Sequence, residues 1–420
     1  MSSIILQPSK LNGSVNIPPS KSLAHRAIIC ASLARGRSII KNVEYSKDIK
    51  ATISCMKELG TIIFEHEDYL EIDGTTTFFK NKCEMNCEES GSTLRFMVPI
   101  SLVDYANVHF TGKGQLGKRP LDVYYQIFDK QNISYLYREN VLDLYVQGKI
   151  SSDEFYIPGD VSSQFISGLL FALPLLEGNS IIHITSPLQS KGYIDLTLQM
   201  LNQYGIEIDY KDNSFYIRGN QSYQPCDYTI EGDYSQAAFY LVAGAFNNNV
   251  QLRGLNINSA QGDKEAIEIL KRMGCQFEYS EDGYQMRSEE LKATDIDASQ
   301  CPDIIPVIAL ACAKAQGVSR IYNAKRLRIK ECDRLKATVE VLNQLGIKAI
   351  EKEEEMIIEG GTIKGGYVSS YNDHRMAMME AIASTVSEAK ITIDNRECVK
   401  KSYLSFWQHF TMLGGMIDEC

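Results

Sequence analysis

Lysine and arginine gather at a few places in a chain that is acidic overall. The 420 residues carry a formal net charge of −10, which disfavours non-specific binding to nucleic acid. A phosphate group carries about −1.5 to −2 charges at neutral pH, and arginine holds phosphate or carboxylate through paired N–H donors. So many basic residues predict ligands with more than one anionic group. The basic clusters are Lys21 and Arg26; Lys113, Lys118 and Arg119; Lys325, Arg326, Arg328, Lys330, Arg334 and Lys336; Arg375; and Lys400 and Lys401.

Several of these residues lie where helices are expected to begin. The first backbone N–H groups and the helix dipole already favour an anion there, so a basic side chain is locally unfavourable unless an anion binds. Six polar clusters each open an apolar run of helix length. They are Ser20-Lys21-Ser22-Leu23-Ala24-His25-Arg26, Ser90-Gly91-Ser92-Thr93-Leu94-Arg95, Ser162-Ser163-Gln164-Phe165, Asp233-Tyr234-Ser235-Gln236, Pro302-Asp303-Ile304-Ile305 and Asp373-His374-Arg375-Met376.

The spacing of the clusters indicates a repeat. Their first residues lie 70, 72, 71, 69 and 71 positions apart, so the chain consists of about six copies of one unit. Six helix ends, each marked by a Gly or Asn that can cap the helix in the left-handed conformation, recur with a similar period. Short β-branched segments between the helices predict strands. The predicted helix ends are at Gly60, Asn132, Gly205, Gly274, Gly346 and Gly414.

Length and composition predict a globular protein of two or three domains. The composition is 44% hydrophobic and 23% charged, and the longest apolar stretch, 165–176, is too short and too interrupted to cross a membrane. Eleven cysteines without a Cys-x-x-Cys pair predict reduced thiols, a cytoplasmic location and no zinc site. Six repeats divide naturally into three plus three, with a junction near 228–230.

The glycine run at 112–117 is a weak signal by itself. It gives a loose G-x-G-x-x-G, and no G-x-x-x-x-G-K-[ST] loop occurs in the chain. We interpret this run as a mobile loop that delivers Arg119 to an anion.

The ordered motifs resemble those of the 5-enolpyruvylshikimate-3-phosphate synthase family, also called 3-phosphoshikimate 1-carboxyvinyltransferase. The resemblance runs from about residue 10 to the end, and eight motifs in the same order make it specific. The motifs are Pro19-Ser20-Lys21-Ser22 with Arg26, Ser90-Gly91-Ser92-Thr93 with Arg95, Lys118-Arg119-Pro120, Ser162-Ser163-Gln164, Ser190 with Tyr193, Pro302-Asp303, Arg328-x-Lys330-Glu331-x-Asp333-Arg334, and Asn372-Asp373-His374-Arg375-Met376-Ala377-Met378.

The resemblance implies an α/β fold of two lobes, each made of three βαβαββ units in an inside-out α/β barrel. The N-terminal lobe would span 21–229, and the C-terminal lobe would comprise 1–20 and 230–420. The chain would then cross between the lobes twice, and the active site would lie in the cleft between them.

The family's reaction transfers the enolpyruvyl group of phosphoenolpyruvate to the 5-hydroxyl of shikimate 3-phosphate and releases phosphate. Each substrate carries a carboxylate and a phosphate, which accounts for the number of basic residues. By resemblance, Ser22, Arg26, Ser162, Ser163, Gln164, Ser190, Tyr193, Asp303, Arg326 and Lys330 bind shikimate 3-phosphate. Lys21, Gly91, Arg119, Gln164, Arg334, His374, Arg375 and Lys401 bind phosphoenolpyruvate.

The transfer needs a base for the hydroxyl proton and an acid that protonates the methylene carbon, giving a tetrahedral intermediate. Asp303 is the candidate base and Glu331 the candidate acid, with Lys21 assisting the same proton transfers. Taken alone, Asp303 would be read as a helix cap and Glu331 as a solvent-facing helix residue. Asp373 is expected to cap its helix and to orient Arg375, and Asp233 is expected to cap the helix that follows it.

Three positions depart from the family pattern. They are Glu89, where Asn is frequent, Arg326, where Asn or Glu is usual, and Leu404, where Pro is common. The departure at Arg326 leaves open how that residue contacts the substrate phosphate. The acid, the base and the main anion-binding residues are retained.

Two other functions fit parts of this pattern. The sister enzyme, UDP-N-acetylglucosamine enolpyruvyl transferase, shares the repeat, but it usually carries a reactive cysteine five residues before the loop arginine, where this chain has Gly114. A non-catalytic anion-binding protein on the same scaffold would be expected to have lost Asp303 or Glu331. The sequence therefore favours the 3-phosphoshikimate 1-carboxyvinyltransferase activity over both alternatives. The protein is expected to be a cytoplasmic monomer with small-molecule substrates, no cofactor, no metal, and no nucleic-acid or membrane partner.

Overall fold

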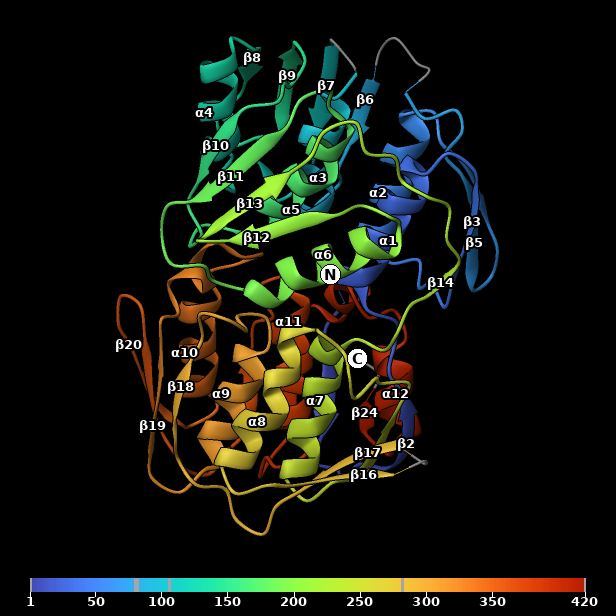
Figure 1. Cartoon of the computed structure of the whole chain (residues 1–420). Helices are drawn as coiled ribbons and strands as arrows, with labels where there is room; N and C mark the ends of the chain where they lie inside the picture. The colour runs from blue at the N-terminus through green and yellow to red at the C-terminus, as the bar shows by residue number, and fades with distance from the viewer. Residues whose placement is uncertain (1, 79–82, 105–106, 281–282, 419–420) are drawn as a thin grey trace. The chain divides into compact units, whose positions relative to one another are not determined.

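The computed structural model describes residues 2–78, 83–104, 107–280 and 283–418. The chain forms two compact units, one comprising residues 19–230 and the other residues 1–18 and 231–420. Both units are built from the same repeat, in which a strand and a buried helix are followed by a strand, a second helix and a hairpin (Figure 1). The fold class predicted from the sequence, α/β with repeated βαβαββ units, is confirmed.

Each repeat folds into a four-stranded mixed sheet. In the sheet β6-β7-β9-β8, the strand before the first helix pairs in parallel with the strand after it, and the hairpin then adds two antiparallel strands. A parallel pair needs a crossover, which the first helix supplies. The described residues form six sheets of this kind.

The unit of residues 19–230 contains three repeats around one hydrophobic core. Its first sheet is completed by β14, from the end of the unit, which pairs in parallel with β3. The elements are β14 (Tyr228–Thr229), α1 (Lys21–Leu33), β3 (Arg37–Lys41), α2 (Lys47–Glu58), β4 (Ile62–Glu65) and β5 (Tyr69–Asp73); β6 (Cys83–Asn86), α3 (Gly91–Ser101), β7 (Asn107–Thr111), the 3₁₀ helix η1 (Leu116–Lys118), α4 (Asp122–Gln131), β8 (Ser134–Tyr137) and β9 (Asp143–Gln147); and β10 (Glu154–Ile157), α5 (Ser163–Ala172), η2 (Leu173–Leu175), β11 (Ser180–Ile184), α6 (Lys191–Gln203), β12 (Ile208–Lys211) and β13 (Ser214–Ile217).

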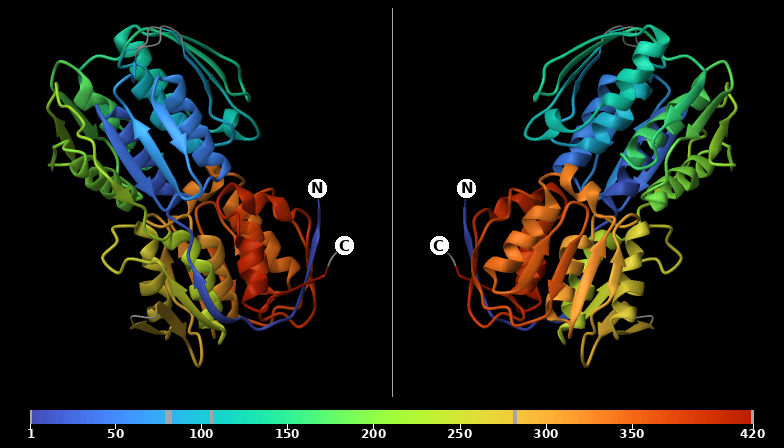
Figure 2. Two further views of the ribbon diagram at one scale, coloured as in Figure 1. Left: turned by 90° about the vertical axis from the view of Figure 1, so that its right-hand side faces the viewer. Right: turned by 90° about the vertical axis from the view of Figure 1, so that its left-hand side faces the viewer.

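The other unit contains the remaining three repeats around a second core. The N-terminal segment gives it two strands: β2 pairs with β15, and β1 pairs with β23 and β24, so that the dark blue start of the chain lies beside its red end in Figure 2. The elements are β2 (Asn12–Asn16), α7 (Tyr234–Ala245), β15 (Asn249–Arg253), η3 (Gly262–Lys264), α8 (Glu265–Arg272), β16 (Gln276–Ser280) and β17 (Gly283–Arg287); β18 (Asp295–Asp297), α9 (Ile305–Lys314), β19 (Val318–Tyr322), η4 (Lys325–Ile329), α10 (Arg334–Gln344), β20 (Lys348–Glu351) and β21 (Met356–Glu359); and β22 (Gly366–Val368), α11 (His374–Ala383), β23 (Ile391–Ile393), η5 (Arg396–Lys401), α12 (Phe406–Met412), β24 (Met416–Asp418) and β1 (Ile4–Gln7).

The first helix of each repeat is an inner helix. Helix α3 is buried on nearly every face and α7 on all of them, whereas the second helices α2 and α8 are buried on one side only. A helix that is apolar all round must be enclosed, which explains the six apolar runs in the sequence. All six predicted openings lie at the starts of these inner helices.

Capping residues define both ends of the repeat. Ser20, Ser90, Ser162, Asp233 and Asp373 each accept a backbone N–H in the first turn of an inner helix. The six predicted helix ends have positive φ angles, between 55° at Asn132 and 102° at Gly60. Left-handed residues at these positions satisfy the last carbonyls of the helices, so both series of predicted helix boundaries are confirmed.

Close packing of α3 against α5 in the first unit predicts that Gly168 tolerates no side chain. A Cβ atom there would lie 2.4 Å from the Arg95 carbonyl oxygen and 2.6 Å from the Tyr124 hydroxyl oxygen. Gly168→Ala is therefore expected to destabilise the protein by about 1–3 kcal/mol, measured as a lower midpoint of thermal or urea unfolding. Gly361→Ala is the matched control, because its nearest atom would be 3.6 Å away. Equal midpoints for the two variants would contradict the prediction.

Candidate active site

In the unit of residues 1–18 and 231–420, one buried arginine joins three carboxylates. Arg334 begins α10, and its side chain is 1% exposed. Its Nη1 atom lies 2.8 Å from Asp303, its Nη2 atom 2.6 Å from Glu331, and its Nε atom 2.7 Å from Asp373. These carboxylates come from the starts of α9, α10 and α11, so Arg334 gathers three chain segments that are far apart in sequence. Their charges hold the pKa of Arg334 well above its ordinary value although burial lowers it.

Asp303 and Lys330 form a close pair within this cluster. The Lys330 ammonium lies 3.1 Å from the Oδ1 atom of Asp303, the same oxygen that Arg334 contacts. Burial alone would raise the pKa of Asp303, but Lys330, Arg375 and Arg334 together hold it well below the ordinary value. Burial lowers the pKa of Lys330 to about 8, against the opposing effect of Asp303. The cluster thus holds an ionised carboxylate beside an ammonium that can lose its proton near neutral pH.

The candidate base is not a helix cap, and the candidate acid does not face solvent. Asp303 does not cap α9, whose N-cap position is Ile304 and has no side-chain cap. The side chain of Glu331 is 15% exposed and is bound by Arg334 instead of facing solvent. Asp373 caps α11 through the backbone N–H of Arg375, as expected. Asp233 caps α7, also as expected.

The remaining predicted residues of this unit surround the same inner helices. The guanidinium of Arg375 donates to the carbonyl of Ser235 at 3.3 Å, which links the starts of α11 and α7. His374 is buried, with its Nδ1 atom 3.7 Å from Asp373. Lys401 ends η5, and the next residue, Ser402, accepts a hydrogen bond from Gln236 of α7. Arg326 lies on η4 and is close enough to Lys330 to lower the pKa of its ammonium.

In the unit of residues 19–230, Lys21 and Arg26 are held at the start of α1. The ammonium of Lys21 lies 2.9 Å from Asp48, a carboxylate that the sequence analysis did not assign. Arg26 donates to the Ser22 carbonyl, to Thr197 and to the Tyr193 carbonyl, at 2.7–2.8 Å. Burial lowers the pKa of Arg26 to about 10. These bonds connect α1 to α6 and fix the backbone of Ser22 and Tyr193.

Arg119 lies directly over the first residue of α3. A Cβ atom on Gly91 would lie 2.5 Å from the Nη1 atom of Arg119, so the glycine allows the guanidinium to approach the helix start. The Arg119 guanidinium therefore lies beside the backbone N–H groups of the first turn of α3, an arrangement suited to an anion. The predicted loop contributes the short helix η1 just before Arg119.

The starts of α3 and α5 are joined by a second arginine, Arg95. Its Nη1 atom donates to the Gln164 side-chain oxygen at 2.7 Å, and the amide nitrogen of Gln164 donates to Ser92 at 2.9 Å. Arg95 also packs over the ring of Phe165, with 5.0 Å from its Cζ atom to the ring centre. Ser162 and Ser163, at the start of α5, are buried. Arg95 was part of a recognised motif, but its part in fixing Gln164 could not be predicted from the sequence.

Ser190 has an unusual backbone at the start of α6. Its φ of 52° and ψ of 42° lie in the left-handed region, and its side chain does not cap the helix. A left-handed serine is uncommon, and such residues often cluster at ligand sites. The conformation agrees with a binding role, which stays a prediction.

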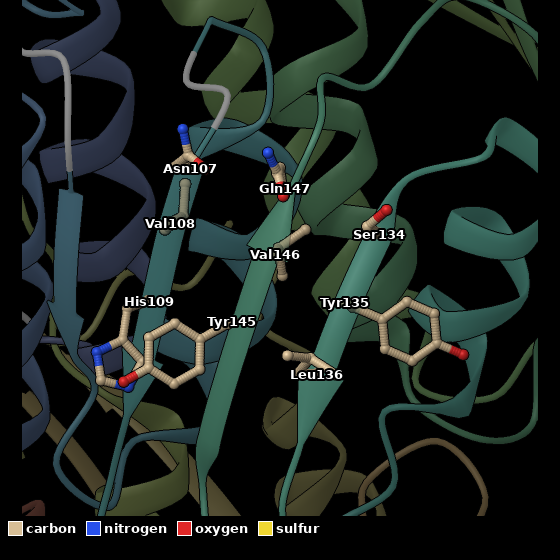
Figure 3. A pocket seen from close by; sticks show the side chains of 9 residues that line it. All are labelled: Asn107, Val108, His109, Ser134, Tyr135, Leu136, Tyr145, Val146 and Gln147. Carbon is tan, nitrogen blue, oxygen red and sulfur yellow. The ribbon is translucent and has the colours of Figure 1, made fainter.

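A pocket elsewhere on this unit does not belong to the predicted site. It lies on β7, β8 and β9, and none of the described residues that line it carries a predicted role (Figure 3). Its histidine, His109, stacks on Tyr145 with 3.8 Å between ring centres and contacts Glu84 and Asp143. Within the described ranges, no group of His, Cys, Asp or Glu is arranged to hold a metal ion. None of the described helices combines the length and apolar composition that crossing a membrane requires.

Comparison with known proteins identifies the family. A family model described as EPSP synthase (3-phosphoshikimate 1-carboxyvinyltransferase) matches residues 5–410. The chain is 52% identical to a 3-phosphoshikimate 1-carboxyvinyltransferase of Clostridium beijerinckii, covering 100% of this chain and 99% of that protein. The corresponding protein of Clostridioides difficile is 51% identical over the same shares.

Solved structures share the fold. An EPSP synthase of Acinetobacter baumannii superposes with a TM-score of 0.81 at 24% identity, covering 100% of this chain and 99% of that one. The enolpyruvyl transferase NikO of Streptomyces tendae superposes with a TM-score of 0.81 at 14% identity, covering 99% and 98%. The family model and the relatives that match over the full length show that this chain belongs to the EPSP synthase family.

Proposed function

We propose that this chain performs its family's transfer with residues from both compact units. The enolpyruvyl group of phosphoenolpyruvate passes to the 5-hydroxyl of shikimate 3-phosphate, and phosphate leaves. The observation that carries the residue assignment is the buried cluster in which Arg334 joins Asp303, Glu331 and Asp373. It supplies an ionised acceptor and a second carboxyl group within the reach of one guanidinium, as an addition and elimination sequence requires.

In the addition step, Asp303 takes the proton of the substrate hydroxyl as its oxygen attacks the enol carbon. Glu331, with Lys21 assisting, delivers a proton to the methylene carbon, which becomes a methyl group. In the elimination step the C–O bond to phosphate breaks, and the methyl group returns a proton to regenerate the enol. The proton taken by Asp303 leaves with the phosphate, and the proton lost by the methyl group returns to Glu331, so both groups regain their starting protonation states. The sequence involves no net oxidation or reduction.

The anion-binding residues divide between the substrates. Shikimate 3-phosphate is bound by the serines at the starts of α1, α5 and α6, with Arg26, Gln164, Tyr193, Asp303, Arg326 and Lys330. Phosphoenolpyruvate is bound by Lys21, Gly91, Arg119, Gln164, Arg334, His374, Arg375 and Lys401. Both sets draw on residues of both units, so each substrate needs groups from the two.

The competing acceptor is UDP-N-acetylglucosamine. Identity of about 52% to 3-phosphoshikimate 1-carboxyvinyltransferases over the full length does not favour it. Phosphate release from phosphoenolpyruvate should therefore require shikimate 3-phosphate, and release with the sugar nucleotide alone would overturn the assignment. We further propose that the protein is a cytoplasmic monomer without a nucleic-acid partner, which the reduced cysteines and acidic charge support.

Removal of the proposed base should affect turnover more than binding. Asp303→Asn keeps the size of the side chain but accepts no proton, so kcat should fall by about 10²–10⁴. Both KM values should change little, and the unfolding midpoint shows whether the cluster remains assembled. Near-normal kcat with a raised KM for shikimate 3-phosphate alone would show that Asp303 only binds the substrate and is not the base.

Substitutions in the two units should weaken the same substrate. Arg119→Ala in the unit of residues 19–230 and Arg375→Ala in the other each remove an anion-binding group, so KM for phosphoenolpyruvate should rise at least about tenfold in both. The KM for shikimate 3-phosphate, measured with saturating phosphoenolpyruvate, is the control. An effect on phosphoenolpyruvate from only one of the two variants would contradict the assignment of residues from both units to this substrate.

The pH dependence should report Lys330. With a pKa of about 8, the ammonium that pairs with Asp303 is present below pH 8 and lost above it. The value of kcat/KM for shikimate 3-phosphate should therefore fall as pH rises through about 8, and Lys330→Arg should move this fall to higher pH because arginine stays charged. A rise through the same range would instead make neutral Lys330 the base.

A further inference from the structure

A line of buried hydrogen bonds runs from α1 to the start of α3. The Nδ1 atom of His25 lies 2.7 Å from the hydroxyl of Thr52 on α2, and Thr52 lies 2.8 Å from the hydroxyl of Thr93 on α3. Thr93 donates its hydroxyl proton to Ser90 at 2.7 Å. All four side chains are at most 1% exposed. We name these residues, His25, Thr52, Thr93 and Ser90, the hydroxyl chain.

The direction of every proton in the hydroxyl chain follows from one donor. The one hydroxyl proton of Thr93 has two acceptors, Ser90 at 2.7 Å and the Asp48 carbonyl at 3.4 Å, and the shorter contact to Ser90 is favoured. With either acceptor, Thr93 must itself accept at its contact with Thr52. The proton of Thr52 is then used, so Thr52 must accept from His25. His25 therefore carries its proton on Nδ1, and the lone pair is on Nε2.

The surroundings of His25 agree with this tautomer. Its Nε2 atom is buried and has no hydrogen-bond partner among the described residues, so a proton there would be left unsatisfied. Burial lowers the pKa of His25 to about 3, while Asp48 opposes and Lys21 and Arg26 add to the shift. The ring is therefore neutral at physiological pH and acts as a fixed donor through Nδ1.

Ser90, the last member of the hydroxyl chain, can donate a further hydrogen bond. Ser90 accepts both the hydroxyl proton and the backbone N–H of Thr93, at 2.7 and 3.2 Å, which occupies both of its lone pairs. Its own O–H is then available only as a donor. Ser90 directly precedes Gly91, the helix start on which the Arg119 guanidinium lies. Ser90 is 0% exposed in this structure, so an anion reaches its hydroxyl only when neighbouring side chains shift.

We propose that His25 is a positioning residue for phosphoenolpyruvate: through Thr52 and Thr93 it directs the hydroxyl of Ser90 to donate to the anion bound at the start of α3. The inference rests on the proposed function, which places phosphoenolpyruvate at Gly91 and Arg119. A line of hydrogen bonds that all point the same way strengthens its last donor, because each bond polarises the next. Without His25 or Thr52, the protons can reverse, and Ser90 no longer has a fixed donor direction.

Thr52→Val interrupts the hydroxyl chain with little change of shape and does not alter any proposed substrate contact. The KM for phosphoenolpyruvate should rise about 5- to 10-fold, the size expected for weakening one hydrogen bond to a charged group. The values of kcat and of KM for shikimate 3-phosphate should change less than twofold. His25→Leu should give the same pattern, whereas His25→Asn should restore KM because the amide nitrogen can replace Nδ1–H.

The effects of the two breaks should not add. Thr52→Val combined with His25→Leu should raise KM no more than either single variant, since both interrupt one line of bonds. Thr61→Val is the matched control: it removes a part-buried threonine pair of the same unit, Thr61 with Thr77 at 2.9 Å, and should lower the unfolding midpoint without changing KM.

The outcomes separate this inference from the proposed function. If Arg119→Ala leaves KM for phosphoenolpyruvate unchanged, the assignment of α3 is wrong. If Arg119→Ala raises it but folded Thr52→Val stays within twofold of the parent protein, the hydroxyl chain plays no part in binding. Additive effects in the double variant, or failure of His25→Asn to restore KM, would show a general packing effect and overturn the proposal.

Discussion

The guanidinium of Arg334 is the interaction on which one half of the site depends. It is almost fully buried and is surrounded by three carboxylates from three separate segments. A buried charge of this kind is tolerated only when it is well paired, and removing one partner of a buried pair typically costs about 3–5 kcal/mol. The starts of α9, α10 and α11 are therefore tied to one another by charge as well as by packing. Asp303 and Glu331 cannot move independently, which fixes the distance between these two carboxyl groups.

The inner helices make this convergence possible. Each repeat encloses one apolar helix, so the polar residues of its first turn lie at one end of the packed unit. Capping by Ser or Asp satisfies some N–H groups of that turn and leaves others for a ligand. Three such ends per unit give a surface rich in donors, although the chain as a whole is acidic. The repeat thus builds an anion site from a feature that every helix has.

Within the other unit, directed hydrogen bonds fix the residues beside the first turn of α3. Arg95 fixes Gln164, Gln164 fixes Ser92, and the hydroxyl chain fixes Ser90, all next to the first turn of α3. Lys21 has its own counter-charge in Asp48. The groups around Arg334 are therefore held mainly by ion pairs, whereas those beside α3 are held mainly by directed hydrogen bonds.

The sequence by itself determined the repeat, the helix boundaries and the family. The signals were local: apolar runs at intervals of about 71 residues, Ser or Asp caps, and left-handed Gly or Asn at helix ends. Local patterns of this kind can be recognised without the structure. It also supplied the residue types of the site, because anionic substrates need many cations and an acid and base.

The tertiary structure decided what those residues touch. That Asp303 binds Arg334 and Lys330 instead of capping α9, that Asp48 pairs with Lys21, and that His25 reaches Ser90 through two threonines all depend on contacts between helices far apart in the chain. The same holds for the pKa of Lys330, which burial sets near 8. Burial and direction are properties of packed side chains, so no spacing along the sequence could have revealed them.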